Sequence, residues 1–169
     1  MTPRLVVVGM PASGKSTVGQ EVATALGVPF VDADRVIEER TGKLIREIFS
    51  DEGEAAFRAI EESVVLDALT SDGVVSLGGG AVLSSVIREA LQGVPVAWLQ
   101  VSVATATRRA GLNQLRPLLL GDVRARMEAL LEERRHLYES VATIQISTER
   151  TTPADLAVAI VEALEKKDA

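Results

Sequence analysis

The sequence predicts an α/β domain built on a mostly parallel β-sheet. Apolar strand-like runs and helical patterns alternate along the whole chain, which is the order that a parallel sheet with crossover helices requires. The first predicted strand, residues 5–8, leads directly into a glycine-rich loop and then into a helix with apolar residues on one face. No internal repeat or low-complexity linker interrupts this pattern, so we expect residues 1–169 to form a single domain.

Hydrophobic periodicity and turn residues place the individual elements. The predicted strands are 5–8, 28–31, 74–77, 94–101 and 143–147. The predicted helices run from the glycine loop to Gly27, then over 34–40, 45–49, 52–69, 84–91, 102–109, 122–141 and 153–166. The stretch from about 110 to 122 breaks the pattern with glycines and a proline, and we predict that it is a mobile lid over the site.

Composition excludes several classes of protein. A net charge of −6 without a basic tail disfavours a nucleic-acid partner, which requires a broad cationic face. The chain has no cysteine, so disulfides and cysteine-based metal sites are excluded. We see no signal peptide and no run of about 20 apolar residues. We therefore expect a cytoplasmic enzyme with no membrane partner.

The glycine-rich loop carries the strongest chemical signal. Residues 9–17, Gly-Met-Pro-Ala-Ser-Gly-Lys-Ser-Thr, match the pattern G-x-x-x-x-G-K-[ST] of loops that cradle nucleotide phosphates. Glycines aim successive N–H groups inward, and the following helix adds partial positive charge at its N-terminus. Lys15 can reach the β- and γ-phosphates, and Ser16 can place its hydroxyl on Mg²⁺. A chance glycine-rich turn is disfavoured because a strand and a helix flank the motif.

Two aspartates follow the second predicted strand. In a protein with a phosphate loop, one carboxylate is expected near the metal, and a second can accept a proton from an attacking hydroxyl. Asp32 and Asp34 are two residues apart, so a continuing strand would point them to opposite sides. The structural alternative is that Asp34 only caps the next helix.

Three consecutive glycines, Gly78 to Gly80, follow the third predicted strand. One glycine usually suffices for a turn, so three in a row favour close approach of the backbone to a ligand. Two arginine segments are less clear. Arg58 lies at ion-pair spacing from Glu61 or Glu62, and Arg135 lies at that spacing from Glu132, so spacing alone favours solvent-exposed pairs.

Taken together, these segments resemble the shikimate kinase family over almost the whole chain, and most of all its actinobacterial members. The resemblance rests on the phosphate loop, Asp32-Ala33-Asp34, Arg58-x-x-Glu61, Ser76-Leu77-Gly78-Gly79-Gly80, Arg116-Pro117-Leu118-Leu119 and Arg134-Arg135-His136-Leu137-Tyr138. It implies a three-layer P-loop kinase fold with a five-stranded parallel sheet, helices on both faces and a mobile lid. It also implies ATP-dependent phosphorylation of the shikimate 3-hydroxyl, which gives shikimate 3-phosphate and ADP in chorismate and aromatic amino-acid biosynthesis.

The resemblance also implies roles for individual residues on the nucleotide side. ATP is the co-substrate, one Mg²⁺ ion per subunit is held near Ser16 and Asp32, and the protein is expected to be a monomer. The implied nucleotide-binding residues are Ala12, Ser13, Gly14, Lys15, Ser16, Thr17, Arg109, Arg116 and Thr151. Arg109 matches an arginine that packs on adenine, and Arg116 of the lid matches one that approaches the transferring phosphate. Family members often carry an arginine where this chain has Thr151 beside Arg150.

On the acceptor side, the resemblance implies a substrate-binding region at about 33–61. Asp34 contacts substrate hydroxyls and is the candidate base, and with Lys15 and Arg116 it forms the implied catalytic set. The other implied shikimate-binding residues are Arg58, Gly79, Gly80 and Arg135. We expect the guanidinium groups of Arg58 and Arg135 to meet across one cleft, because a planar fork binds a carboxylate through two hydrogen bonds.

Two other functions are compatible with a phosphate loop. A gluconate or nucleoside-monophosphate kinase would share the superfamily, but two arginines converging on a carboxylate favour shikimate as the acceptor. A GTPase-type switch would need D-x-x-G and N-K-x-D motifs, and the chain contains neither of them.

Overall fold

The computed structural model describes residues 1–111 and 120–169. Its five strands form one sheet with the order β2-β3-β1-β4-β5, and every neighbouring pair is parallel. The strands are β1 Leu5–Val8, β2 Phe30–Asp32, β3 Val74–Ser76, β4 Val96–Gln100 and β5 Ile144–Ser147. The predicted α/β class and the five parallel strands are therefore confirmed.

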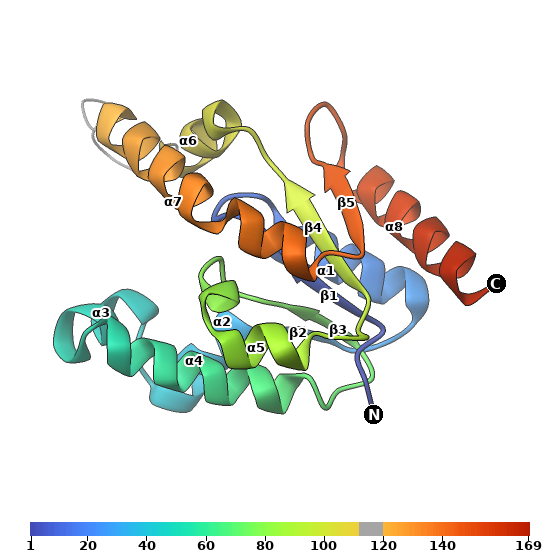
Figure 1. Ribbon diagram of the computed structural model, residues 1–169, viewed down its shortest axis with the longest axis horizontal. Helices are drawn as coiled ribbons and strands as arrows, with labels where there is room; N and C mark the ends of the chain where they lie inside the picture. Colours follow the sequence, from blue (N-terminus) through green and yellow to red (C-terminus); the bar gives the residue numbers. More distant parts are fainter. Residues whose placement is uncertain (112–119) are drawn as a thin grey trace.

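Helices cover both faces of this sheet (Figure 1). They are α1 Lys15–Leu26, α2 Ala33–Thr41, α3 Ile45–Glu52, α4 Glu54–Ala68, α5 Ser85–Ala90, α6 Val103–Gly111, α7 Leu120–Val141 and α8 Pro153–Asp168, with one 3₁₀ turn, η1 Ala81–Leu83. In the two described ranges, no helix has both the length and the apolar character needed to cross a membrane.

Alternation along β1 creates two cores, one on each face. Leu5 and Val7 pack with α1 and α8, whereas Val6 and Val8 pack with helices that include α4, α5 and α7. All four side chains are buried, as expected for a central parallel strand whose two faces are both covered. The result is the three-layer arrangement that the resemblance implied.

The order of the strands places a ligand site at the carboxyl end of β1. Because β3 lies on one side of β1 and β4 on the other, the direction of the chain reverses there. Ligands of open α/β sheets bind outside the carboxyl ends of the strands at such a switch point. The phosphate loop, the two aspartates and the three glycines all lie at or just after the carboxyl ends of β1, β2 and β3, with Asp32 as the last residue of β2.

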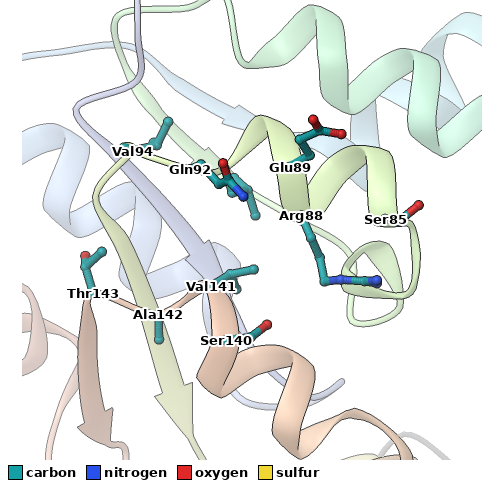
Figure 2. Close-up of a pocket in the computed structure, with 11 residues that line it drawn as sticks. Ser85, Arg88, Glu89, Gln92, Val94, Ser140, Val141, Ala142 and Thr143 are labelled. Carbon is teal, nitrogen blue, oxygen red and sulfur yellow. The ribbon is translucent and has the colours of Figure 1, made fainter.

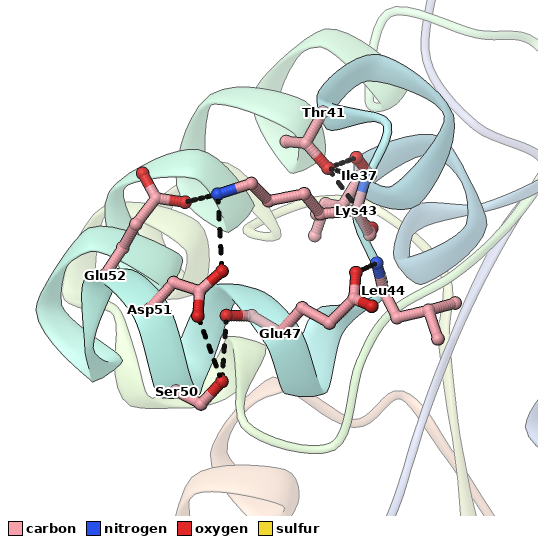
Figure 3. Close-up of polar contacts among 8 residues, drawn as sticks. All are labelled: Ile37, Thr41, Lys43, Leu44, Glu47, Ser50, Asp51 and Glu52. Atoms are coloured by element: carbon pink, nitrogen blue, oxygen red, sulfur yellow. Dashed lines mark hydrogen bonds and ion pairs between the residues drawn. The ribbon is translucent and has the colours of Figure 1, made fainter.

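A polar network closes the corner between α2 and α3 (Figure 3). Lys43 lies 3.6 Å from a carboxylate oxygen of Asp51 and 3.5 Å from one of Glu52, and it ties the end of α3 back to its start. The N–H of Leu44 donates to the Glu47 carboxylate at 2.9 Å. Each exposed pair contributes at most about 1 kcal/mol, but together they hold the corner that precedes α4.

Side chains cap the helices α2, α5 and α6 at their N-termini. Ser84 and Ser102 accept hydrogen bonds from main-chain N–H groups of α5 and α6, the usual role of serine at the start of a helix. At α2, the cap is Asp32 and not Asp34, because the helix begins at Ala33. Asp34 is thereby free of the capping role that the structural alternative gave it.

The predicted lid lies mostly outside the described residues. Helix α6 extends to Gly111 and helix α7 begins at Leu120, so the prediction for about 110–122 falls largely on 112–119. Arg116 lies within this range.

Candidate functional site

The phosphate loop joins β1 to α1 as its motif requires. Gly14 has φ 89°, a left-handed conformation that a side chain disfavours. Ala12, with φ 65°, adopts the left-handed region without being glycine, which marks local strain of the kind that collects at functional sites. The Lys15 ammonium donates to the carbonyl of Met10 at 3.0 Å and is thereby held over the loop.

Ser16 and Asp32 meet beside this loop. The Ser16 hydroxyl donates to the Asp32 carboxylate at 2.6 Å, although the two residues belong to different elements. A hydroxyl and a carboxylate oxygen are the ligands that Mg²⁺ takes, with the remaining positions filled by water and phosphate. Within residues 1–111 and 120–169, no group of three or more His, Cys, Asp or Glu side chains is arranged to hold a metal.

A cavity of about 410 Å³ opens on the outer side of the loop. It brings together residues predicted to bind nucleotide, namely Ala12, Ser13, Gly14, Thr17, Arg109 and Thr151. Arg109 donates to the carbonyl of Ala12 at 3.1 Å, so α6 is tied directly to the loop. The walls from Val18 and Leu156 are apolar, which suits a planar base next to its phosphates.

Lys15 and Asp34 have shifted pKa values. Burial lowers the pKa of Lys15 to about 8, against the opposing charges of Asp34 and Asp32. Burial and the neighbouring Asp32 raise the pKa of Asp34 to about 6. A buried ammonium beside a carboxylate of raised pKa is typical of a catalytic site.

The three glycines let charged groups approach the backbone. A Cβ on Gly78 would lie 2.6 Å from an Asp34 carboxylate oxygen, and one on Gly79 would lie 2.9 Å from Pro11 of the phosphate loop. A Cβ on Gly80 would collide with the guanidinium group of Arg58. The predicted residues Asp34, Arg58, Gly79 and Gly80 are therefore close together, next to the phosphate loop.

Arg58 forms the predicted ion pair, but not at an exposed surface. Its guanidinium donates to Glu61 at 2.7 Å, and the Glu61 side chain is 3% exposed. Burial raises the pKa of Glu61, while the hydrogen bond from Arg58 and the charges of Arg58 and Arg134 oppose that rise. The ion pair thus holds the Arg58 guanidinium beside Gly80. It is not an ion pair on a solvent-exposed helix face.

Of the two adjacent arginines of α7, the structure buries Arg134, whereas the sequence led us to expect Arg135 at the acceptor. Arg134 is 7% exposed, and its charge acts on Lys15, Glu61 and Tyr138. Arg135 is exposed and lines a different cavity of about 230 Å³. The reason is helical geometry, because adjacent residues project about 100° apart and only one of them can face the sheet.

Unpartnered polar atoms mark where a ligand fits. In the described part of the chain, three buried side-chain atoms have no hydrogen-bond partner: Ser13 Oγ, Arg58 Nε and Arg134 Nε. Such atoms are rare in folded proteins, and each one needs an explanation. One belongs to the phosphate loop, one to Arg58 beside Gly80 and one to Arg134 of α7, so the unpartnered atoms fall on residues around the same site.

The cavity drawn in Figure 2 belongs to another part of the molecule. It has a volume of about 610 Å³ and is lined by residues that include Arg88, Val94, Ser140 and Thr143. Val94 and Thr143 precede β4 and β5, so this cavity lies at the amino ends of the strands. None of the predicted site residues lines it.

Three residues of the site were not predicted as such: Glu61, Arg134 and Tyr138. The spacing of these residues in the sequence is the feature that could have identified them. Met127, Arg134 and Tyr138 recur at intervals of seven and four along α7 and all three are buried, whereas Arg135 falls outside that series. For Glu61, the signal is its i,i+3 relation to Arg58.

Shikimate kinases resemble this chain over nearly its whole length. The family model for shikimate kinase matches residues 11–165. The chain is 52% identical to a shikimate kinase of Mycobacterium avium over 171 residues, covering 100% of this chain and 97% of the relative. It is 48% identical to a shikimate kinase of Thermobifida fusca over 163 residues, covering 96% and 95%.

Solved structures show the same fold. The structure of Acinetobacter baumannii shikimate kinase in complex with shikimate has a TM-score of 0.91 and 33% identity, covering 99% of this chain and 94% of the other. A gluconokinase from Sinorhizobium meliloti has a TM-score of 0.63 at 21% identity, with 96% and 91% coverage, and shows the fold alone. Together with the match of the family model, these findings establish that the chain belongs to the shikimate kinase family.

Proposed function

We propose that this chain transfers the γ-phosphoryl group of ATP to the 3-hydroxyl of shikimate. The observation that carries the proposal is the placement of two arginines, the half-buried Arg58 and the buried Arg134, around the glycine segment next to Asp34 and the phosphate loop. Planar guanidinium groups bind a carboxylate through paired hydrogen bonds, and shikimate carries one carboxylate beside its hydroxyls.

On the nucleotide side, the loop residues Ala12 to Thr17 bind the phosphates, and Arg109 and Thr151 flank the base in the adjoining cavity. Lys15 neutralises charge that develops on the transferring phosphoryl group. Ser16 and Asp32 hold one Mg²⁺ ion, which supplies charge neutralisation and orientation of the phosphates when bound.

On the acceptor side, Arg58 and Arg134 bind the carboxylate over a floor made by Gly79 and Gly80. Asp34 orients the attacking hydroxyl and accepts its proton, for which a pKa of about 6 is well placed near neutral pH. Glu61 acts through Arg58, since it fixes the guanidinium and does not itself face the acceptor.

We propose further that residues 1–169 form one kinase domain, with the acceptor-binding region at about 33–61 and the lid at about 110–122. Arg116 of the lid approaches the transferring phosphate, and closure excludes water that would otherwise hydrolyse ATP. We expect a cytoplasmic monomer, as a small biosynthetic kinase with two diffusible substrates requires no second subunit.

A coupled assay of ADP release tests the proposal. ADP release should depend on shikimate and on Mg²⁺, and neither gluconate nor AMP should replace shikimate. Turnover with gluconate or AMP and none with shikimate would refute the proposed acceptor.

A further inference from the structure

Tyr138 is a buried residue to which the reaction described above assigns no role. Its side chain is 0% exposed, and its ring stacks on Trp98 of β4 with centroids 5.8 Å apart. Its hydroxyl donates to the carbonyl of Gly79 at 2.6 Å. Burial raises the pKa of Tyr138 to about 12, so the phenol is a neutral donor at every working pH.

Gly79 is held from two sides. Its carbonyl accepts from Tyr138, and its Cα faces Pro11 so closely that a Cβ would lie 2.9 Å from Pro11 Cδ. The glycine segment therefore rests between the phosphate loop and α7. The peptide unit between Gly79 and Gly80 is thereby held by a hydrogen bond on one side and by packing on the other.

Because the peptide unit is planar, the position of the Gly79 carbonyl also sets the direction of the Gly80 N–H. In a trans peptide, the C=O of one residue and the N–H of the next point in opposite directions. Because Tyr138 draws the Gly79 carbonyl towards α7, the N–H of Gly80 points away from α7. Among the described residues, no side chain or carbonyl accepts a hydrogen bond from this N–H, and the guanidinium of Arg58 lies beside the same residue.

Resting on the proposed function, we propose that Tyr138 is a positioning residue for the acceptor: its hydroxyl holds the Gly79 carbonyl so that the Gly80 N–H is aimed at the shikimate carboxylate. Tyr138 does not touch the acceptor. Its position four residues after Arg134 on α7 places both on the same helix face, so one helix supplies a carboxylate-binding cation and the group that orients a backbone donor.

The variant Tyr138→Phe tests this directly, because it removes the hydroxyl and keeps the ring against Trp98. Loss of one hydrogen bond in the supporting structure should raise the KM for shikimate about 3- to 10-fold, while kcat and the KM for MgATP stay within about twofold. The preference for shikimate over its neutral carboxamide analogue should fall by a similar factor. Those two changes are ones that a loss of fold stability alone does not produce.

Thr143→Val is a matched control. It removes a hydroxyl that donates to the carbonyl of Val96 at 3.2 Å and accepts from the N–H of Val96 at 2.9 Å, at the amino end of the sheet. We expect it to lower the melting temperature without changing the KM for shikimate or the preference for the carboxylate. If Tyr138→Phe behaves in the same way, its role is structural and the proposal is wrong.

A second measurement leaves the buried contact in place. The chain has one tyrosine, so 3-fluorotyrosine labels position 138 alone. Saturating shikimate without nucleotide should shift the ¹⁹F resonance, and the carboxamide analogue should shift it less. An unchanged resonance with shikimate bound contradicts the proposal. Absence of shikimate phosphorylation by the unaltered protein would instead refute the proposed function.

Discussion

The two sides of the site are built from different parts of the chain. The proposed phosphate-binding part is one short loop, and the cations Lys15 and Arg109 donate to the carbonyls of Met10 and Ala12 in that loop. The acceptor side is made by charged side chains from β2–α2, α4 and α7, packed against the glycine segment. We infer that phosphate recognition is local in the sequence, whereas recognition of the acceptor depends on tertiary packing.

This difference has an energetic counterpart. Backbone N–H groups bind phosphate without any change in protonation, and their positions are fixed by the loop itself. The acceptor side instead buries carboxylates at a cost, which is why the pKa values of Asp34 and Glu61 are raised. Variants of the acceptor side should therefore affect both substrate binding and pH dependence, while variants of the loop should affect turnover.

The largest effect is expected for Lys15→Ala. Removing an electrostatic contact to the transferring phosphoryl group typically lowers kcat about 100- to 1000-fold. Within residues 1–111 and 120–169, the Lys15 ammonium donates only to a carbonyl of its own loop, so the circular dichroism spectrum should remain that of the parent protein. A folded variant with unchanged kinetics would contradict the assignment of the loop.

Asp34→Asn should have the next largest effect. Asparagine preserves the size of the side chain and some hydrogen bonding but cannot take a proton, so kcat should fall about 100-fold while shikimate still binds. Single-turnover kinetics and titration calorimetry separate these two quantities. Near-normal kcat would leave Asp34 as a binding residue only.

The pH profile sharpens the same assignment. With Asp34 required as carboxylate and Lys15 as ammonium, kcat/KM should rise through an apparent pKa of about 6 and fall through one of about 8. In Asp34→Asn, the acidic limb should disappear. An acidic limb that persists in this variant would have to come from another group.

The pH dependence of the free energy of unfolding should also reflect the raised pKa of Asp34. Its pKa is about 6 in the folded state against an ordinary 3.8, so the folded protein binds more protons between these values than the unfolded chain. The contribution of this group to the free energy of unfolding therefore falls as pH rises from 3.8 to about 6. Melting temperatures across this range should show a smaller decline for Asp34→Asn than for the parent.

The smallest effect is expected on the outer edge of the nucleotide cavity. Arg109→Ala should raise the KM for ATP about 3- to 10-fold and leave the KM for shikimate unchanged, since one charge-assisted contact to the loop is lost. The neighbouring Arg108 is exposed, so Arg108→Ala is the matched control and should change neither value. Equal effects of the two variants would mean that Arg109 contributes only its positive charge and not its specific contact with the loop.

The sequence was sufficient for the parts of the molecule that are local. The strands and the phosphate loop between a strand and a helix follow from short patterns, and the structure reproduces them. The sequence named Arg135 for the acceptor site, whereas the structure buries Arg134 and leaves Arg135 exposed, because burial depends on which face of α7 meets the sheet. Met127 and Tyr138 lie on the same buried face of α7 as Arg134, but this face is known only when the helix is seen packed against the sheet.

The contact of Tyr138 with Gly79 could not be predicted either. It joins residues 59 positions apart, and neither residue type signals a partner by itself. The buried state of Glu61 was equally hidden, because the same i,i+3 pair with Arg58 occurs on exposed helices. The sequence thus identified the ion pair of Arg58 with Glu61, but it predicted an exposed pair, whereas the Glu61 side chain is buried.

The central claim is that charged side chains brought together by tertiary packing form the acceptor site. The most direct test of this claim compares Arg134→Lys with Arg135→Lys. Each substitution keeps the charge and loses the planar fork. Titration calorimetry should show shikimate binding at least about tenfold weaker in Arg134→Lys, with MgADP binding within about twofold of the parent, and no change in Arg135→Lys. Weaker shikimate binding in Arg135→Lys together with parent-like binding in Arg134→Lys would contradict the site described here.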